Sequence, residues 1–351
     1  MSLCPVDGEP GEVFAELRDW WQAPDGPLVV RTSGSSGTAR NVALSHAALL
    51  ASATASQRRL GGPAAWVLAL PVTFVAGLQV LVRSLLAGTS PVLFGDHDGD
   101  WPAALAVAEK SAGDAGVHRR CTALVPTQLH RLAREHRLGE IADLDAVLVG
   151  GAGVDAELLA DARAAGVRVV TTYGMTETCG GCVYDGEPLD GVAVRVASDR
   201  RVHLAGPCLF DGYPEEPAAT AEALVDGWLR TQDLGHIDDD GRLHVLGRVD
   251  DVVVSGGVNV ALPAVERALR SHPRVADVAA AGVADPEWGT RVVVVVQPDG
   301  PAPTLDELRD HVAASLPRTW APRGLTLVDR LPVLPNGKPD RVAAVRLARA
   351  C

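Results

Sequence analysis

The chain has 351 residues, of which 47% are hydrophobic, 22% are charged and only 4% are aromatic, a balance that excludes a disordered or fibrous protein. Its formal net charge of -12 argues against nucleic acid as the main partner, because phosphate backbones are bound by basic surfaces. The length exceeds what one hydrophobic core usually serves, so we expect one large domain and a smaller one.

Short apolar strands alternate with helical segments through the first two thirds of the chain. The expected strands are PLVV, AWVLALPV, SPVLF, DAVLVGG and VRVVTTYG, and the expected helices are SHAALLASA, GLQVLVRSLLAG, WPAALAVAEK and AELLADARAAG. This alternation is typical of an α/β domain with a largely parallel sheet. Such domains bind ligands at the carboxyl ends of their strands, so the loops that follow the strands are the first places to look for a site.

The pattern changes after Gly186. As far as Gly247, apolar and polar residues alternate between turn signals such as DDDG, which predicts a small antiparallel barrel or sheet. After GRVDD comes a compact α+β unit with the strands VVVSGGVNV, VADVAAAGV and RVVVVVQ and the helices PAVERALRSHP and TLDELRDHVAASLP. We read RVVVVVQ as a buried core strand. The predicted domains are therefore residues 1–249 and 250–351.

The amino terminus and the cysteines indicate a soluble, cytoplasmic protein. MSLCPVDGEPGEVFAEL lacks the basic and apolar regions of a signal peptide, and no uninterrupted apolar stretch reaches 18 residues, so we expect no membrane association. Six scattered cysteines suit reduced thiols. Cys179 and Cys182 have CxxC spacing, but no second CxxC or histidine cluster completes a zinc site, so we expect small residues in a tight loop there.

Lysine is rare in this chain. Among 32 basic residues the only lysines are Lys110 and Lys338, and the remainder are arginines. Lysine is a compact charge on a flexible stem, whereas arginine is a rigid planar fork. Lys338, in the Pro/Gly-framed turn LPNGKPDR, is therefore a candidate functional residue. The alternative is a chance survivor on a surface loop, which is the reading we adopt for Lys110.

The stretch RTSGSSGTAR, residues 31–40, follows an apolar strand. Glycines let backbone N–H groups approach phosphate oxygens and hydroxyls add donors, yet the Walker pattern fails because no lysine precedes the last hydroxyl residue. Alone, such a loop is more often a flexible turn.

A second strand-end loop, TTYGMTETCGG, combines three useful groups. Tyr173 can stack on a purine, Thr176 can donate to a phosphate oxygen, and Glu177 is a hard oxygen ligand suited to Mg²⁺. Upstream, VGGAG is another glycine loop on which a flat ring could lie. The alternative for Tyr173 is a core aromatic.

Further along, RTQDLG supplies Asp233, a carboxylate able to accept hydrogen bonds from both ribose hydroxyls. LGRVDD supplies Arg248 beside it. The alternative for these two residues is a simple surface ion pair.

Together, TSGSSGT, YGMTE, RTQDLG, GRVDDVVVSGG and LPNGKPDR form an ordered set that resembles the acyl- and aryl-CoA synthetases, adenylation domains and luciferases, which activate carboxylates as acyl-adenylates. The resemblance runs from about residue 28 to the end. The short amino terminus, which lacks the region that usually precedes the phosphate loop, and the segments LPVTFVAGLQVLVRSLLAG, LVPTQL and SGGVNV are most similar to the compact o-succinylbenzoate-CoA ligases of menaquinone biosynthesis.

This resemblance implies an enzyme that uses ATP, Mg²⁺ and coenzyme A, with o-succinylbenzoate as its small carboxylate. It implies that the β- and γ-phosphates are covered by Thr32, Ser33, Gly34, Ser35, Ser36, Gly37 and Thr38. The rest of the nucleotide would be held by Gly150, Gly151, Ala152, Tyr173, Gly174, Met175, Asp233 and Arg248. Thr176 would contact the α-phosphate, and Glu177 would bind the metal.

The resemblance also implies two conformations. In the first step Lys338 would bridge the carboxylate and the phosphate. The small domain would then rotate about Asp250, withdrawing Lys338 and bringing Ser255, Gly256 and Gly257 to line a tunnel for pantetheine.

The sequence departs from the family at several positions. Arg40 stands where a lysine is common, Gln232 replaces a glycine, and Phe74 stands where relatives often have histidine. Phe74 can wall off the acyl pocket but cannot form a side-chain hydrogen bond. The second carboxylate of o-succinylbenzoate would need a cation, for which Arg83 is the candidate; its alternative is a solvated helix face. The missing amino-terminal region would expose a surface, which makes a homodimer an expectation.

Three alternatives stay open from the sequence. The chain could be another aryl- or acyl-CoA ligase, an aryl-acid adenylating enzyme that loads a carrier protein, or a catalytically inert nucleotide-binding relative. The lack of a carrier-like segment after Cys351 favours free coenzyme A. The presence of both Glu177 and Lys338 argues against an inert binder.

Overall fold

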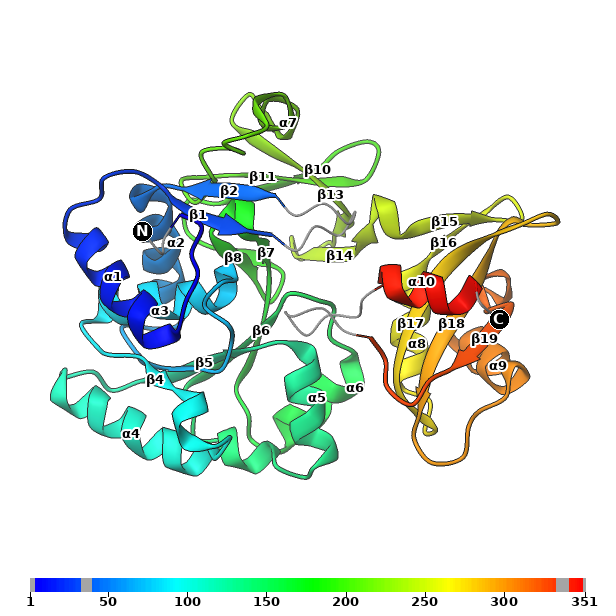
Figure 1. Ribbon diagram of the computed structural model, residues 1–351, viewed down its shortest axis with the longest axis horizontal. Helices are drawn as coiled ribbons and strands as arrows, with labels where there is room; N and C mark the ends of the chain where they lie inside the picture. The colour runs from blue at the N-terminus through cyan, green and yellow to red at the C-terminus, as the bar shows by residue number, and fades with distance from the viewer. Residues whose placement is uncertain (1–3, 33–39, 333–340, 350–351) are drawn as a thin grey trace. The chain divides into compact units, whose positions relative to one another are not determined.

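The computed structural model describes residues 4–32, 40–332 and 341–349 and divides the chain into two compact units (Figure 1). One unit comprises Met1–Thr231 and Ile237–His244, and the other comprises Gln232–His236 and Val245–Cys351. In the described ranges, no helix combines the length and apolarity needed to cross a membrane.

A seven-stranded sheet forms the centre of the first unit, in the order β4-β3-β5-β6-β7-β8-β9. Strands β4 to β7 are parallel, whereas β8 and β9 are antiparallel to their neighbours. The strands are β3 (Ala65–Leu68), β4 (Val92–Leu93), β5 (Arg120–Leu124), β6 (Ala146–Gly150), β7 (Val169–Met175), β8 (Gly180–Tyr184) and β9 (Glu187–Pro188). The parallel pairing places the carboxyl ends of β6 and β7 side by side.

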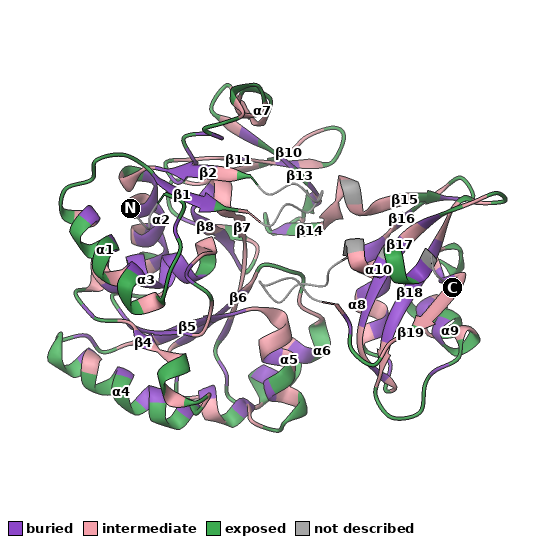
Figure 2. Cartoon of the chain, in the orientation of Figure 1, coloured by how far each residue is buried: buried purple, intermediate pink, exposed green. Residues whose placement is uncertain are grey.

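Helices cover both faces of this sheet. One face packs against α1 (Pro10–Gln22), α2 (His46–Arg59) and α3 (Val75–Ala87), and the other against α4 (Trp101–Asp114), α5 (Pro126–Arg134) and α6 (Ala156–Ala164). Successive strand residues point to opposite faces, so Trp66 joins the first core and Val67 the second. Figure 2 shows the buried strands between the two helix layers. The predicted α/β domain with a mainly parallel sheet is confirmed.

The glycine-rich stretch connects two paired strands. β1 (Leu28–Arg31) and β2 (Asn41–Leu44) are antiparallel, with Arg31 opposite Asn41. The Thr32 amide donates to the Arg40 carbonyl at 2.8 Å, which closes the hairpin at the base of the loop. The sequence predicted β1 and α2 but not β2. Because NVAL is only four residues long and runs directly into the Ser45 N-cap of α2, its pattern merged with the helix.

The region predicted as an antiparallel barrel or sheet is a five-stranded sheet in the order β10-β11-β13-β12, with β14 paired to β13. The strands are β10 (Ala193–Val196), β11 (Arg201–Ala205), β12 (Leu224–Val225), β13 (Trp228–Ile237) and β14 (Leu243–Arg248), and α7 (Pro217–Ala223) precedes β12. Buried residues alternate with half-buried ones along β11 and with mostly exposed ones through much of β13, as expected for a sheet with one covered face.

The second unit is an α+β domain built on a five-stranded sheet, in the order β16-β15-β18-β17 with β19 parallel to β18. Its elements are β15 (Val252–Ser255), β16 (Val258–Ala261), α8 (Leu262–Arg270), β17 (Val275–Asp285), β18 (Gly289–Pro298), α9 (Leu305–Ser315), β19 (Gly324–Leu327) and α10 (Arg341–Arg349). RVVVVVQ lies in β18. Val292 and Val294 pack with α8 and α9, and Val293 packs with α10, so the strand is buried on both faces as predicted.

Candidate active site

The two segments predicted as strand-end loops lie side by side at the ends of β6 and β7, although Tyr173 and Met175 still belong to strand β7. Gly150, the last residue of β6, pairs with Thr172 of β7, one residue before Tyr173. A side chain at Gly150 would place its Cβ 2.2 Å from the Thr172 Oγ1, so only glycine allows these strands to approach so closely. Gly151 follows with φ +82°, and it and Ala152 are exposed. The structure therefore brings an open glycine backbone beside the YGMTE segment.

The segment after Tyr173 forms a tight turn, the 3-10 helix η3 (Thr176–Thr178) between β7 and β8. A Cβ at Gly174 would lie 2.0 Å from the Gly180 carbonyl oxygen, which makes glycine obligatory there. The Thr178 hydroxyl accepts from the Met175 amide at 2.9 Å and donates to the Gly180 carbonyl at 2.7 Å. These contacts hold Thr176 and Glu177 directly after the carboxyl end of β7.

Two helices support this turn from inside the core. The carbonyl of Cys179, at the end of η3, accepts from Gln79 Nε2 of α3 at 2.7 Å and from Ser52 Oγ of α2 at 3.1 Å. Both donor side chains are buried. Neither residue was predicted from the sequence, although polar residues within apolar helix faces were an available signal.

Glu177 has a partner that was likewise not predicted from the sequence. The Tyr213 hydroxyl donates to Glu177 Oε1 at 2.9 Å, and the Phe210 amide donates to the Glu177 carbonyl at 2.9 Å. Tyr213 is only 8% exposed, and its ring lies 4.9 Å from that of Phe210. Burial, and after it the neighbouring Glu177 carboxylate, raise the pKa of Tyr213 above its ordinary value, so this hydroxyl stays protonated and acts as a donor.

The carboxylate of Glu177 is suited to the role of a magnesium ligand. Tyr213 engages one of its oxygens, and the other has no hydrogen-bond partner among the described residues. Within the same ranges, no three His, Cys, Asp or Glu side chains form a group that could hold a metal ion. Mg²⁺ is commonly bound by one or two carboxylates together with substrate phosphates and water. A single half-buried glutamate matches the protein's share of that donor set.

Phe74 and Arg83 lie on the same helix in different surroundings. Phe74 is half-buried at the N-cap of α3, in the connection that follows β3. Arg83 is 5% exposed, and one of its amino groups donates to the Tyr184 hydroxyl at 3.3 Å. Its guanidinium carbon lies 5.0 Å from the centre of the Trp66 ring. The solvated helix face considered for Arg83 is therefore wrong, because α3 is enclosed by the sheet, α1 and α2.

Asp233 and Arg248 form an ion pair in the second unit, with 3.5 Å between Arg248 Nη1 and Asp233 Oδ1. The Asp233 side chain is 11% exposed and that of Arg248 is 34% exposed, so the carboxylate is enclosed while the guanidinium is partly open to solvent. Gln232 is exposed between buried Thr231 and Asp233, because consecutive strand residues face opposite ways. A side chain at 232 therefore leaves Asp233 undisturbed.

The SGG segment forms the turn between β15 and β16. Gly256 has φ +57°, and a Cβ there would lie 2.5 Å from the Trp288 ring. The Gly256 amide donates to the Trp288 carbonyl at 3.0 Å, and Arg323 covers the ring at 3.8 Å. Ser255 is 2% exposed, and its hydroxyl has no hydrogen-bond partner in the described part of the chain. Gly257 follows with φ +78°.

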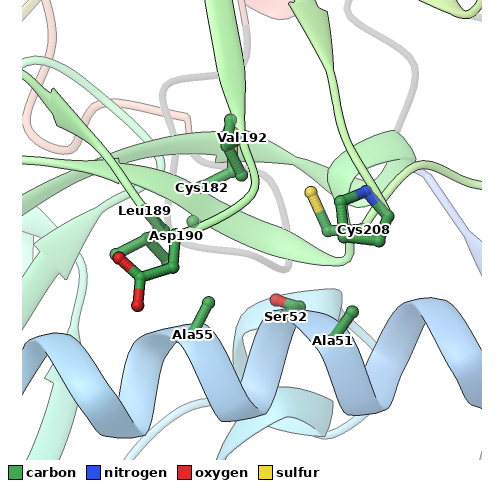
Figure 3. A pocket seen from close by; sticks show the side chains of 10 residues that line it. Ala51, Ser52, Ala55, Cys182, Leu189, Asp190, Val192 and Cys208 are labelled. Carbon is green, nitrogen blue, oxygen red and sulfur yellow. The ribbon is translucent and has the colours of Figure 1, made fainter.

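The CxxC pair is part of the core. Figure 3 shows Cys182 and Cys208 beside Ser52 and Ala55 around a cavity of about 10 Å³, which has room for roughly one water molecule and not for a substrate. Burial raises the pKa of Cys179 well above that of a free thiol, so the group stays protonated. The five described cysteines are free.

Several predicted residues lie outside the described part of the chain. These are Lys338 and the loop residues Ser33, Gly34, Ser35, Ser36, Gly37 and Thr38. The backbone of Asp250 belongs to the 3-10 helix η4 (Val249–Asp251), whereas its side chain is not described.

Comparison with protein families identifies the chain. The family model described as AMP-binding enzyme matches residues 12–211, more than half of the sequence. The chain belongs to the AMP-binding enzyme family. The model of the C-terminal domain of AMP-binding enzymes matches residues 264–338, within the second unit.

Individual relatives agree with this assignment. The chain is 47% identical over 353 aligned residues to a probable 2-succinylbenzoate–CoA ligase of Mycobacterium tuberculosis (strain CDC 1551 / Oshkosh), covering 98% of this chain and 91% of that protein. Among solved structures, the o-succinylbenzoate CoA synthetase of Bacillus subtilis in complex with its acyl-adenylate intermediate matches with a TM-score of 0.77 and 28% identity, over 90% of this chain and 68% of that one. The same enzyme with ATP and magnesium ion matches with a TM-score of 0.76 and 27% identity, over the same shares.

Proposed function

We propose that this protein is an ATP-dependent, AMP-forming ligase that converts o-succinylbenzoate to its coenzyme A thioester. The observation that carries the proposal is the 47% identity to a probable 2-succinylbenzoate–CoA ligase across nearly the whole of both chains. The turn that presents Glu177 beside the β6 glycines supports it, because these residues suit a metal–nucleotide complex.

Several separate segments would hold the nucleotide. Tyr173 and the backbone of residues 150–152 offer a flat surface for adenine, which their adjacency on β6 and β7 supports. The enclosed Asp233 would accept hydrogen bonds from the ribose hydroxyls, with Arg248 limiting the cost of burying that carboxylate. The loop from Thr32 to Thr38 would cover the terminal phosphates, and the β1–β2 hairpin anchors its ends.

In the first step, a carboxylate oxygen of the substrate attacks the α-phosphorus of ATP, the bond to the bridging oxygen breaks, and pyrophosphate leaves. Two anions must meet, so cationic and hydrogen-bonding groups supply the main stabilisation. Thr176 would donate to the α-phosphate and Lys338 would bridge the two reacting anions. A magnesium ion held by Glu177 would neutralise phosphate charge when bound.

In the second step, the thiol of coenzyme A attacks the acyl carbonyl and AMP leaves. Lys338 has to withdraw to give the thiol access, and we propose rotation of residues 250–351 about Asp250 for this purpose. Ser255, Gly256 and Gly257 would then line the pantetheine path. The positive-φ turn at Gly256 and Gly257, which carries no side chain of its own, supports this role.

Arg83 is our candidate for the second carboxylate of o-succinylbenzoate. No carboxylate of the described residues lies within 4 Å of its guanidinium, and its Nε has no hydrogen-bond partner there. Buried charges are normally paired. A substrate carboxylate would supply the missing anion.

The proposal is tested with a panel of carboxylates, scored for AMP release that depends on coenzyme A. The panel contains o-succinylbenzoate, simple benzoates and fatty acids. We expect the highest kcat/KM with o-succinylbenzoate. Activity confined to fatty acids would overturn the substrate assignment, and ATP binding without turnover of any acid would indicate an inert relative.

A further inference from the structure

A short segment after β11 ties the phosphate-loop hairpin to the turn that carries Glu177. The Ala43 amide of β2 donates to the Gly212 carbonyl at 3.0 Å, and the Asp211 amide donates to the Ala43 carbonyl at 2.9 Å. One residue earlier, the Phe210 amide donates to the Glu177 carbonyl at 2.9 Å. The backbone of residues 210–212 is therefore held between β2 and η3.

Tyr213 extends this link through its side chain. Its backbone is fixed by its amide, which donates to the Thr220 hydroxyl at 2.8 Å, and its own hydroxyl donates to Glu177 Oε1. Arg40, the residue that closes the loop hairpin, lies with its guanidinium carbon 5.3 Å from the centre of the Tyr213 ring. Glu216 anchors Arg40 with 3.2 Å between Oε1 and Nε. A continuous contact path thus runs from the base of the loop to the Glu177 carboxylate.

We propose that Tyr213 is a positioning residue for metal–nucleotide binding: its hydroxyl holds Glu177 Oε1 so that Oε2 points outward as the metal ligand. This inference rests on the proposed function for the identity of the nucleotide complex. Tyr213 does not contact the nucleotide in this role and acts through Glu177.

The chemistry of the contact supports a positioning role. The carboxylate of a glutamate, on three rotatable side-chain bonds, samples many orientations, and one hydrogen bond from a buried, protonated phenol removes most of them. Preorganisation of this kind lowers the entropy that metal binding must otherwise remove. Arg40 lies over the Tyr213 ring and Phe210 packs against it at a tilt, so the donor itself has little freedom.

The test compares Tyr213→Phe with the parent by calorimetric titration of ATP, once with saturating Mg²⁺ and once with a chelator. The phenylalanine ring keeps the packing and removes only the hydroxyl. We expect binding of Mg·ATP to weaken about tenfold, the size of one lost hydrogen bond to a charged group, and metal-free ATP binding to stay unchanged.

Tyr184→Phe is the matched control. Tyr184 is also a buried tyrosine whose hydroxyl is hydrogen-bonded, to Ser56 and Arg83, but it does not touch Glu177. Loss of the Tyr184 hydroxyl should lower the thermal unfolding midpoint and leave the Mg·ATP affinity at the parent value. In a double-mutant cycle, Tyr213→Phe should add nothing to the loss caused by Glu177→Gln.

If Tyr213→Phe does not fold, a second measurement on the parent protein tests the proposal. The chain has three tyrosines, so 3-fluorotyrosine labelling gives a simple fluorine NMR spectrum in the intact protein. The Tyr213 resonance should shift when Mg²⁺ is added to the ATP complex, whereas the Tyr184 resonance should not. An unchanged Mg·ATP affinity in Tyr213→Phe, or a Tyr213 resonance insensitive to the metal, contradicts the proposal. Parent protein that fails to bind ATP at all contradicts the proposed function instead.

Discussion

At the residue scale, the role of a side chain depends strongly on the groups that it contacts. Arg83 illustrates this, because a cation inside an apolar core, donating to Tyr184 and packed on Trp66, has no carboxylate partner among the described residues. A site with an unbalanced buried charge favours an anionic ligand.

Replacing Arg83 with alanine should raise KM for o-succinylbenzoate about tenfold, because the second carboxylate loses a charged hydrogen-bond donor. Arg83→Lys, which keeps the charge, should lose less. The control is steady-state kinetics with an analogue of o-succinylbenzoate that keeps the carboxylate to be activated and lacks the second one. The KM for this analogue should not change. An equal rise in KM for both acids would show that Arg83 serves the fold alone.

The residue types of the candidate site could be predicted from the sequence, but their supporting contacts could not. Glu177, Gly150 and Tyr173 stand in short motifs, so a role for each could be predicted from the residue type and its immediate neighbours in the sequence. Tyr213 lies 36 residues from Glu177, and Gln79 lies 100 residues from Cys179. Only the packing of α3 and of the segment after β11 against η3 creates those contacts, and no local pattern encodes them.

At the scale of elements, helix ends carry measurable electrostatics. In α9, Glu307 accepts hydrogen bonds from the amide and hydroxyl of the N-cap Thr304 at 2.8 and 2.9 Å and is paired with Arg274. The Thr304 amide first, and then Arg274, lower the pKa of Glu307 from 4.5 to about 2. A carboxylate with a lowered pKa in the folded state stabilises the protein above pH 4.5, and this contribution is lost as the pH falls toward 2.

We therefore expect Glu307→Gln to lower the thermal unfolding midpoint at pH 6, and the difference from the parent to shrink as the pH is reduced from 5 to 3. Glu157→Gln is the matched control, because this first-turn glutamate of α6 is exposed and has no hydrogen-bond partner among the described residues. Circular dichroism melts across this pH range provide the measurement. A difference independent of pH would refute the capping account.

The order and type of most elements followed from hydrophobic periodicity, since strands buried on both faces and helices with one apolar face leave clear patterns. Boundaries were less predictable. AWVLALPV was expected to be one strand, but β3 ends at Leu68, because Pro71 closes a turn in which its carbonyl leaves no room for a side chain on Gly77. The short strand β2 was missed because its pairing partner, not its sequence, defines it.

At the scale of the whole molecule, the proposed chemistry uses residues far apart in the sequence. Glu177 belongs to the first unit, whereas the proposed bridging cation, Lys338, falls in the predicted domain of residues 250–351. A charge carried on a separate domain can be withdrawn between half-reactions, which a lysine within the Thr32–Thr38 loop could not be.

Lys338→Ala should reduce acyl-adenylate formation at least a hundredfold, because the two reacting anions lose their bridging cation. Thioester formation from supplied acyl-adenylate should be retained. Lys110→Ala removes the only other lysine, which is exposed on α4, and should leave both half-reactions unaffected. The half-reactions are measured separately, by pyrophosphate exchange and by thioester release. If the rates of both half-reactions fall equally in Lys338→Ala, the assignment of Lys338 to the first half-reaction alone is wrong.

The most direct test of the central claim is mass spectrometry of the parent protein incubated with ATP, Mg²⁺ and o-succinylbenzoate, first without and then with coenzyme A. Without coenzyme A we predict the mixed anhydride of o-succinylbenzoate and AMP. Addition of coenzyme A should convert it to the thioester and free AMP. If o-succinylbenzoate yields no adenylate while another carboxylate does, the proposed function is contradicted.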